Sequence, residues 1–342
     1  MPSRPLIVRL RNWVGDVVLG VPTLRLLQGR GYALQLVGKP WAQSLLAGEG
    51  WPVHALVGGG LRQRVAQLRA LRRQAQAQDA DFDKRANTLV LPFSFSSALE
   101  ARLAGLAAVG YAHEGRSLLL QRALPRPAGL HELQSYWQLG LQLSPPLPHG
   151  QSGRPDLALS DPPAPPVSIG LAIQPQAQAA AAQRLAVAGI GDGYVLLCPF
   201  AGGTFEGQDK RWPEFAAFAR QAARTWGRPL LLCPGPGEAE AARADYPEAH
   251  VLEGVPLGDY AALLQRCALM VSNDTGPGHL AASVGAPLLS ILGPTDVAQW
   301  GPWGPGVVVL QGQTGWPSVA QVLAAGERLL QQGPGAAHAV AA

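Results

Sequence analysis

The stretch Ser272-Asn273-Asp274-Thr275-Gly276-Pro277-Gly278-His279-Leu280 decides how this chain folds. The apolar run 268–271 leads into it and is typical of a buried parallel strand. Asp274 and Thr275 are residue types that favour a helix N-cap, and Pro277 suits the first helical position. A strand that turns into a helix in this way leaves N–H groups free to bind a phosphate or diphosphate. An ordinary capped helix would use the same residues, so the spacing alone leaves both interpretations open.

Outward from this stretch, apolar strand-like runs alternate with helical patterns along the whole chain. We expect strands at 5–10, 32–37, 88–92, 107–111, 194–198, 229–233, 269–271 and 287–292. We expect helices at 17–28, 61–77, from about 98 onward, and at 130–143, 213–226, 238–245, 258–267, 277–284 and 318–331. This alternation predicts an α/β fold with doubly wound, Rossmann-like parallel sheets.

The composition changes in the middle of the chain, where nine prolines fall between positions 145 and 175. We therefore expect an N-terminal domain at 1–160, a Pro/Ala/Gln-rich linker at 161–190 whose Ala/Gln part can be helical, and a C-terminal domain at 191–332. The Gly/Ala segment 333–342 is expected to be a flexible tail. Because ligands of open α/β sheets bind at the carboxyl ends of the strands, two such domains are expected to share one cleft.

The length, composition and cysteine pattern of the chain predict a cytoplasmic globular protein. Of 342 residues, 47% are hydrophobic and 15% charged, and no apolar run reaches the roughly 20 residues of a membrane-spanning helix. The N-terminus lacks the pattern of a signal peptide. Cys198, Cys233 and Cys267 are scattered in apolar runs, as reduced core thiols are, and no His or Cys pair has metal-ligand spacing.

The net charge of +4 is carried by arginine, since only Lys39, Lys84 and Lys210 are lysines. A modest basic excess suits a phosphorylated substrate or an anionic membrane surface, whereas the dispersed arginines do not predict a nucleic-acid partner. The basic helix at 61–77 fits either such a contact or a solvated face. The acidic run 79–83 precedes a strand instead of following one, so we interpret it as a solvated loop. Neither a dinucleotide-binding nor a P-loop glycine motif follows a suitable strand.

Polar residues gather at four predicted strand ends. Gly15-Asp16 follows the first strand, where Asp16 can act as a general base or merely cap a helix. The glycine-bearing segment 199–204 precedes Lys210, which can neutralise a diphosphate, although a solvated loop has the same composition. Glu238 suits ribose hydroxyls but also favours the start of a helix. In the opening stretch Asp274 and Thr275 suit a sugar phosphate, while a lone histidine there is more often structural.

Several motifs occur together and in order: 12–18, 93–98, Lys210-Arg211-Trp212-Pro213, 273–282 and Gly293-Pro294-Thr295-Asp296. Together they resemble the ADP-heptose:lipopolysaccharide heptosyltransferases of glycosyltransferase family 9. The first motif is most similar to heptosyltransferase II. This resemblance implies a GT-B fold and inverting, metal-independent transfer of heptose from ADP-heptose to the first heptose of the lipopolysaccharide inner core. It also implies a lipid A-linked acceptor, contact with the cytoplasmic face of the inner membrane, no cofactor and no nucleic acid.

By position the resemblance assigns a role to each candidate residue. The implied catalytic residues are Asp16, as base, and Lys210. The implied donor-binding residues are Gly15, Thr204, Lys210, Glu238, Asp274, Thr275, Gly276 and His279. The implied acceptor-binding residues are Asn12, Ser94 and Arg116.

The sequence departs from the family pattern at two places. Gly278 stands where the family often has methionine, which we expect to loosen the packing, and the loop 202–209 is longer than expected. Three alternative functions remain open: a family member with another donor or acceptor, a GT-B-like sugar-nucleotide epimerase, and a non-catalytic nucleotide-sugar binding protein.

Overall fold

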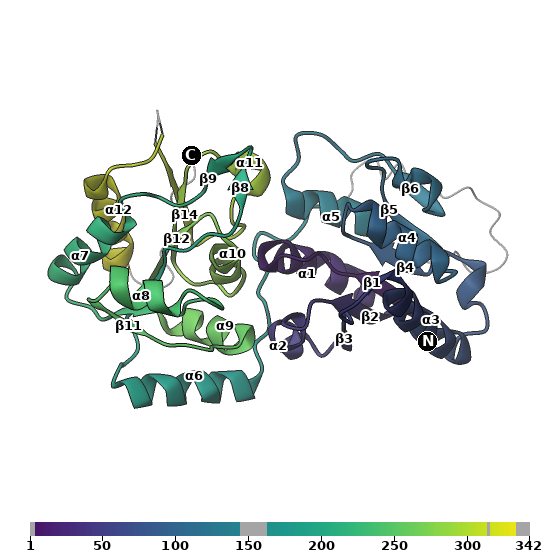
Figure 1. Cartoon of the computed structure of the whole chain (residues 1–342), viewed down its shortest axis with the longest axis horizontal. Helices are drawn as coiled ribbons and strands as arrows, with labels where there is room; N and C mark the ends of the chain where they lie inside the picture. The colour runs from purple at the N-terminus through teal and green to yellow at the C-terminus, as the bar shows by residue number, and fades with distance from the viewer. Residues whose placement is uncertain (1–3, 144–162, 313–314, 333–342) are drawn as a thin grey trace. The chain divides into compact units, whose positions relative to one another are not determined.

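The computed structural model describes residues 4–143, 163–312 and 315–332, and the chain divides into two compact units (Figure 1). Unit 1 comprises residues 1–43 and 50–166, and unit 2 comprises residues 44–49 and 167–342. The 333–342 tail and most of the proline-rich segment lie outside the described residues. Each unit contains its own six-stranded parallel sheet.

The sheet of unit 1 has the strand order β3-β2-β1-β4-β5-β6. Its strands are β1 (Arg4–Arg9), β2 (Tyr32–Gly38), β3 (Val53–Ala55), β4 (Thr88–Val90), β5 (Ala108–Tyr111) and β6 (Arg122–Leu124). The central strand β1 contributes Leu6, Ile7 and Val8 to the core, and all three are fully buried. The chain leaves β1 toward β2 and β3 and then returns to build β4 to β6 on the other side. The reversal lies between β1 and β4.

Helices cover both faces of this sheet (Figure 1). On one face α1 (Val14–Gly29) packs against α5 (Glu132–Leu141), and on the other α3 (Leu61–Gln78) packs against α4 (Phe95–Leu103). Close contact between α1 and α5 requires a small residue, since a Cβ at Gly140 would lie 2.6 Å from the Thr23 methyl group. The remaining short helices of unit 1 are η2 (Phe82–Lys84) and η3 (Arg116–Leu118). The helix α2 (Ala42–Leu45) begins in unit 1 and ends in unit 2, and η1 (Ala47–Glu49) belongs to unit 2.

The sheet of unit 2 repeats this plan with the order β11-β10-β7-β12-β13-β14. Its strands are β7 (Val195–Cys198), β10 (Leu230–Leu232), β11 (Ala249–Val251), β12 (Leu269–Asn273), β13 (Leu288–Leu292) and β14 (Val307–Gln311). Its helices are α6 (Pro175–Ala188), α7 (Phe215–Thr225), α8 (Ala239–Asp245), α9 (Leu257–Arg266), α10 (Gly276–Ser283), α11 (Val297–Trp300) and α12 (Val319–Gln332). Here the strand order reverses between β7 and β12.

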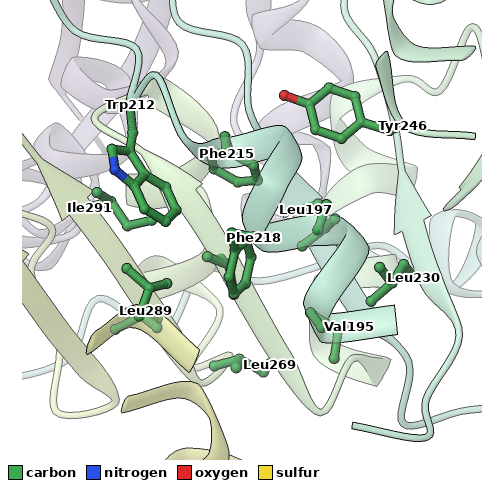
Figure 2. Packing of buried hydrophobic residues seen from close by; sticks show 14 of the residues in the cluster. Val195, Leu197, Trp212, Phe215, Phe218, Leu230, Tyr246, Leu269, Leu289 and Ile291 are labelled. Carbon is green, nitrogen blue, oxygen red and sulfur yellow. The ribbon is translucent and has the colours of Figure 1, made fainter. Parts of the chain in front are cut away.

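An aromatic cluster on α7 forms the core on one face of the unit 2 sheet. Figure 2 shows Phe215 and Phe218 among the apolar side chains of the strands. Their ring centroids are 5.8 Å apart at an interplanar angle of 88°, the edge-to-face geometry that aromatic pairs prefer. Trp212 joins both rings and is only 2% exposed. This packing fixes the backbone directly after Lys210.

The structure corrects several predicted element boundaries. Helix α1 begins at Val14 and not at Val17, so Gly15 and Asp16 lie in its first turn and not in a loop. Helix α4 begins at Phe95, three residues before the predicted start. Helix α7 begins at Phe215, so Pro213 precedes it and does not start it.

The segment predicted as a linker contains a well-packed helix. Helix α6 begins with Pro175, ends at Gly189 in the left-handed conformation (φ 68°), and packs against α9 in unit 2. The backbone N–H of Ala172 also donates to the Glu49 carboxylate at 2.9 Å. The polypeptide at 167–190 is therefore part of unit 2, and the predicted hinge stays a prediction for the residues before it.

Candidate functional site

Three side chains from separate segments meet at the carboxyl edge of the unit 2 sheet. The Lys210 Nζ atom lies 2.7 Å from Oδ2 of Asp274, and the Thr295 hydroxyl donates to the same oxygen at 2.5 Å. The Asp274 side chain is 7% exposed and that of Lys210 21%. Lys210 and Asp274 belong to different clusters in the linear sequence, and the structure brings them together. Thr295 was not predicted as a site residue, although it lies in the motif Gly293-Pro294-Thr295-Asp296.

Asn273 holds this arrangement in place. It is fully buried, its side-chain oxygen accepts from the backbone N–H of Trp212 at 3.1 Å, and its amide donates to the Pro199 carbonyl at 2.5 Å. The segments that follow β7 and precede α7 are thereby tied to the end of β12. A buried amide at the end of an apolar strand was the available signal for this role, because such a group must find partners in the fold.

The stretch 272–280 forms the predicted strand-to-helix turn, between β12 and α10. Thr275 is the N-cap of α10, but its side chain makes no capping hydrogen bond. Its hydroxyl lies 3.7 Å from the Cys198 sulfur. The first N–H groups of a helix have no partner within the helix, and such groups are the type that binds anions, so anion binding at Gly276 stays a prediction. This N-terminus lies at the reversal point of the sheet, where ligands of such sheets bind.

Two further residues of the stretch are packed tightly. His279 is 9% exposed, which fits a structural histidine better than a catalytic one. A Cβ at Gly278 would lie 2.8 Å from the Ser272 hydroxyl. Glycine thus permits a close approach of α10 and β12, contrary to the looser packing expected from the absent methionine.

The other predicted donor-side residues occupy less direct positions. Glu238 precedes α8 and does not lie within it, and its carboxylate accepts from the Gly235 N–H at 2.7 Å. The expected long loop 202–209 is a short hairpin of β8 (Thr204–Phe205) and β9 (Gln208–Asp209). Both residues of its turn, Glu206 and Gly207, have positive φ, as a type I′ hairpin turn requires. Thr204 is exposed on this hairpin.

In unit 1, Asp16 lies at the reversal point between β1 and β4. Its carboxylate accepts from the Arg11 guanidinium at 3.1 Å on one oxygen and from the Tyr136 hydroxyl at 3.2 Å on the other. The residue at the N-cap of α1 is Trp13. Asp16 is therefore held by two side chains, and the interpretation of it as a simple helix cap does not describe its contacts.

Tyr136 is a partner of Asp16 that was not predicted from the sequence. It is fully buried on α5, 120 residues away in the sequence. Burial first, and then the charge of Asp16, raise the pKa of Tyr136 well above its usual value. The hydroxyl thus stays protonated and donates to the carboxylate.

An aromatic ring supports the second partner of Asp16. The Arg11 guanidinium lies 4.3 Å from the ring centroid of Phe93, and the Arg126 guanidinium lies 4.5 Å from the same centroid. Arg126 also pairs with the fully buried Glu132 at 2.6 Å. Two cation–π contacts therefore fix both guanidinium groups on one ring.

The three predicted acceptor residues have different environments. Arg116 is fully buried and donates to the carbonyls of Tyr111, at 2.8 Å, and Pro92, so its guanidinium binds backbone instead of facing solvent. Burial, and then Arg11, lower its pKa to about 10. This corrects the expectation that Arg116 is placed to contact an acceptor phosphate. Asn12 and Ser94 are exposed at the carboxyl edge.

Each carboxylate of the acidic run pairs with a nearby cation, and one of these cations, Arg72, lies on the basic helix. Asp79 pairs with Arg85, Asp81 with Lys84 and Asp83 with Arg72. The acidic run is therefore an ion-paired surface turn, close to the solvated loop predicted. Within the described ranges no group of three or more His, Cys, Asp or Glu side chains has an arrangement that could hold a metal ion.

A family model described as glycosyltransferase family 9 (heptosyltransferase) matches residues 68–322, well over half of the chain. The chain belongs to glycosyltransferase family 9. A curated relative, lipopolysaccharide heptosyltransferase 3 of Escherichia coli, is 32% identical over 124 residues. That match spans 34% of this chain and 36% of the relative, about a third of each. The Asp16 segment precedes the residues that the family model matches.

Solved family 9 structures share the fold of this chain. E. coli heptosyltransferase II superposes with a TM-score of 0.72 at 22% identity, over 96% of this chain and 99% of that one. E. coli heptosyltransferase WaaC, solved with ADP, has a TM-score of 0.66 at 20% identity, over 95% and 99% of the two chains. The predicted α/β GT-B fold with two Rossmann-like doubly wound domains is confirmed.

Proposed function

We propose that this protein transfers heptose from ADP-heptose to the first heptose of the lipopolysaccharide inner core. One observation carries the proposal: Lys210, Asp274 and the N-terminus of α10 converge at the reversal point of the unit 2 sheet. This arrangement combines a cation, a carboxylate and helix N–H groups, which suits a sugar linked to a diphosphate. A family 9 relative solved with ADP supports a nucleotide-sugar donor.

In the proposed reaction, unit 2 holds the donor. Lys210 and the backbone N–H groups at Thr275 and Gly276 would stabilise the negative charge that develops on the departing ADP. Asp274 would accept hydrogen bonds from the donor sugar once its Lys210 partner turns toward the diphosphate. Glu238 would accept from the ribose. Because these groups supply the positive charge, we propose that transfer needs no metal ion, and chelation should leave it unchanged.

Asp16 of unit 1 is proposed as the general base. It would take the proton of the acceptor hydroxyl as the oxygen attacks the anomeric carbon, and the bond from that carbon to the ADP oxygen would break. Attack on the face opposite the leaving group inverts the anomeric centre. The carboxylate is 11% exposed, so it is reachable while Arg11 and Tyr136 fix its orientation.

Two further parts of the proposal concern the acceptor and its location. We propose a lipid A-linked acceptor and a cytoplasmic enzyme at the inner membrane. In the parts of the chain that the structure describes, no helix has the length and apolar character needed to cross a bilayer. A different family 9 donor or acceptor is the main alternative, since the curated match covers only a third of its relative.

The decisive test is incubation of the protein with ADP-heptose and core acceptors of different length, followed by mass spectrometry. We expect one added heptose only on acceptors that already carry a first heptose. Asp16→Asn should abolish transfer but keep donor binding, because it removes the base and leaves unit 2 intact. Asp81→Asn, a change at an exposed carboxylate paired with Lys84, is the matched control. Full turnover by Asp16→Asn would reject the general-base role.

A further inference from the structure

A second carboxylate of unit 1 is buried near the groups that hold Asp16. Glu132 is fully buried in the first turn of α5, and its Oε2 atom accepts from the Arg126 guanidinium at 2.6 Å. A glutamate in the first turn favours the helix dipole, but an exposed side chain would have the same effect. Burial of a charged carboxylate is costly unless a cation compensates it. The complete burial of Glu132 therefore needs a reason beyond the start of the helix.

The N-terminus of α5 is capped without Glu132. The His131 ring accepts from the Leu133 N–H at 3.2 Å, and the Gln134 side chain accepts from the His131 N–H at 3.0 Å. These two bonds form a capping box, which satisfies two N–H groups at the start of the helix. The Glu132 carboxylate is thus not needed as a cap, and its contact with Arg126 indicates a different role.

Glu132 and Asp16 each bind one of two guanidinium groups that lie beside the Phe93 ring. Arg11, which pairs with Asp16 at 3.1 Å, lies 4.3 Å from the ring centroid. Arg126, which pairs with Glu132, lies 4.5 Å from the same centroid. Two cations beside one ring repel each other, and here each cation is balanced by its own carboxylate. The side chains of Arg11 and Arg126 are only 16% and 26% exposed, so water screens this repulsion incompletely.

The charge of Glu132 reaches both groups that hold Asp16. Burial alone would lower the pKa of Arg11, but Tyr136, Asp16 and Glu132 raise it above its usual value. Burial, and then Asp16, raise the pKa of Tyr136, and Glu132 adds to this effect. Tyr136 follows Glu132 by four residues on α5, so the two side chains lie on the same face of the helix. Glu132 therefore acts on the surroundings of Asp16 from two directions.

We propose that Glu132 is a positioning residue, which keeps Arg11 on Asp16 by holding Arg126 away from it. This inference rests on the proposed function, in which Asp16 is the general base. With Glu132 in place, one Asp16 oxygen accepts from Arg11 and the other from Tyr136. Without the Glu132 charge, the Asp16 carboxylate would attract Arg126 as well. A second cation on Asp16 would oppose uptake of the acceptor proton without changing any contact with substrate.

Three variants that remove single charges test this role: Glu132→Gln, Arg126→Gln and the double variant. Glu132→Gln should lower kcat about tenfold and leave KM unchanged, because Asp16 gains a second cation. Arg126→Gln should also lower kcat, because the buried Glu132 then draws Arg11 away from Asp16. The double variant removes both charges, so its kcat should recover to within about threefold of that of the unchanged protein.

A residue that only stabilised the fold would give a different pattern. The kcat of the folded protein would then be unchanged in all three variants, and only the unfolding temperature would fall. Asp79→Asn is the matched control, because Asp79 pairs with Arg85 in the same unit and these side chains are 20% and 16% exposed. It should lower the unfolding temperature without changing kcat. Unchanged kcat in Glu132→Gln, or a double variant no better than the single ones, would overturn the positioning role. A raised KM in Arg126→Gln would place Arg126 on the acceptor and overturn it too.

Crystal structures of the variants separate this inference from the proposed function, since they need no turnover. In Glu132→Gln we expect the Arg126 guanidinium within hydrogen-bond distance of Asp16, and in the double variant we expect Arg11 alone there. Arg11 as the sole guanidinium on Asp16 in Glu132→Gln would overturn the positioning role, whatever the activity. Absence of heptose transfer by the unchanged protein would instead contradict the proposed function, and the two structures would still decide what Glu132 does to Asp16.

Discussion

The Lys210→Met substitution tests the proposed diphosphate site most directly. It removes one positive charge and keeps a side chain of similar length. Two unit charges about 4 Å apart interact by about 4 kcal/mol at an effective dielectric constant of about 20. Lys210 already pairs with Asp274 at 2.7 Å and must leave this carboxylate to bind ADP, so the loss of the existing pair offsets part of that interaction energy. A charged hydrogen bond contributes about 1.5–3 kcal/mol net, and we expect a loss of about 2 kcal/mol, or ADP binding about 30-fold weaker.

The measurement is isothermal titration calorimetry with ADP, and the neighbouring residue provides the control. Arg211→Met removes the same charge one residue away, but Arg211 is 61% exposed and pairs with Asp209 at 2.7 Å. The affinity of the Arg211→Met variant for ADP should stay within about twofold of that of the unchanged protein, because an exposed ion pair contributes little free energy. Comparable losses in the two variants would mean that the overall charge matters and not the position of Lys210.

Removing Lys210 also leaves Asp274 without its cation, which can lower stability. Asp274 keeps its hydrogen bond from Thr295, so we expect a destabilisation of about 1–3 kcal/mol in thermal unfolding. The double variant Lys210→Met, Asp274→Asn should recover much of this stability but not the affinity for ADP. Unchanged affinity in folded Lys210→Met would refute the assignment of Lys210 to the diphosphate.

Three further predictions concern the core, the thiols and the base. Tyr136→Phe should lower kcat about tenfold and leave KM unchanged, because it frees one oxygen of Asp16 without touching substrate; a changed KM alone would contradict this. Burial raises the pKa values of Cys198 and Cys267 to about 12, so both should resist a thiol reagent at pH 8 until the protein is unfolded. Since these thiols ionise near pH 9 in the unfolded chain, stability should be full below that pH and fall as the pH rises toward 12. Phe218→Ala should cost about 3–5 kcal/mol in denaturant unfolding, because its fully buried ring contacts Trp212, Phe215 and Trp226.

The strands that the sequence predicted and those that it missed differ in their place in the sheets. Every predicted strand is central or lies next to the centre, where both faces are covered and the sequence is continuously apolar. In the two six-stranded sheets the missed strands are the four edges β3, β6, β11 and β14, and the short hairpin of β8 and β9 was missed as well. None of the four edge strands is fully buried. The strands β3, β6 and β11 are only three residues long, too short for a clear pattern, whereas β14 does contain an apolar run at 307–310 that the prediction overlooked.

Candidate residues could be predicted wherever the signal was local. The Asp-Thr-Gly turn after a buried strand, the lysine in an arginine-rich chain and the Gly15-Asp16 pair all stand out in the linear sequence, and the order of motifs indicated the family. What the sequence could not give was the partner of each group. Tyr136 is 120 residues from Asp16, and nothing in its neighbours distinguishes it from a core tyrosine. Arg116 looked available for an acceptor, yet its burial on backbone carbonyls is a property of the packed sheet.

By itself, then, the sequence determined the alternation of strands and helices, the two doubly wound units and the strand ends at which polar groups gather. These follow from periodicity and from backbone preferences that extend over a few residues. Only the tertiary structure decided that Lys210 and Thr295 contact the same oxygen of Asp274 and that Asp16 is held by Arg11 and Tyr136. The physical reason is that strand order in the sheet, which local pattern does not encode, sets which strand ends become neighbours.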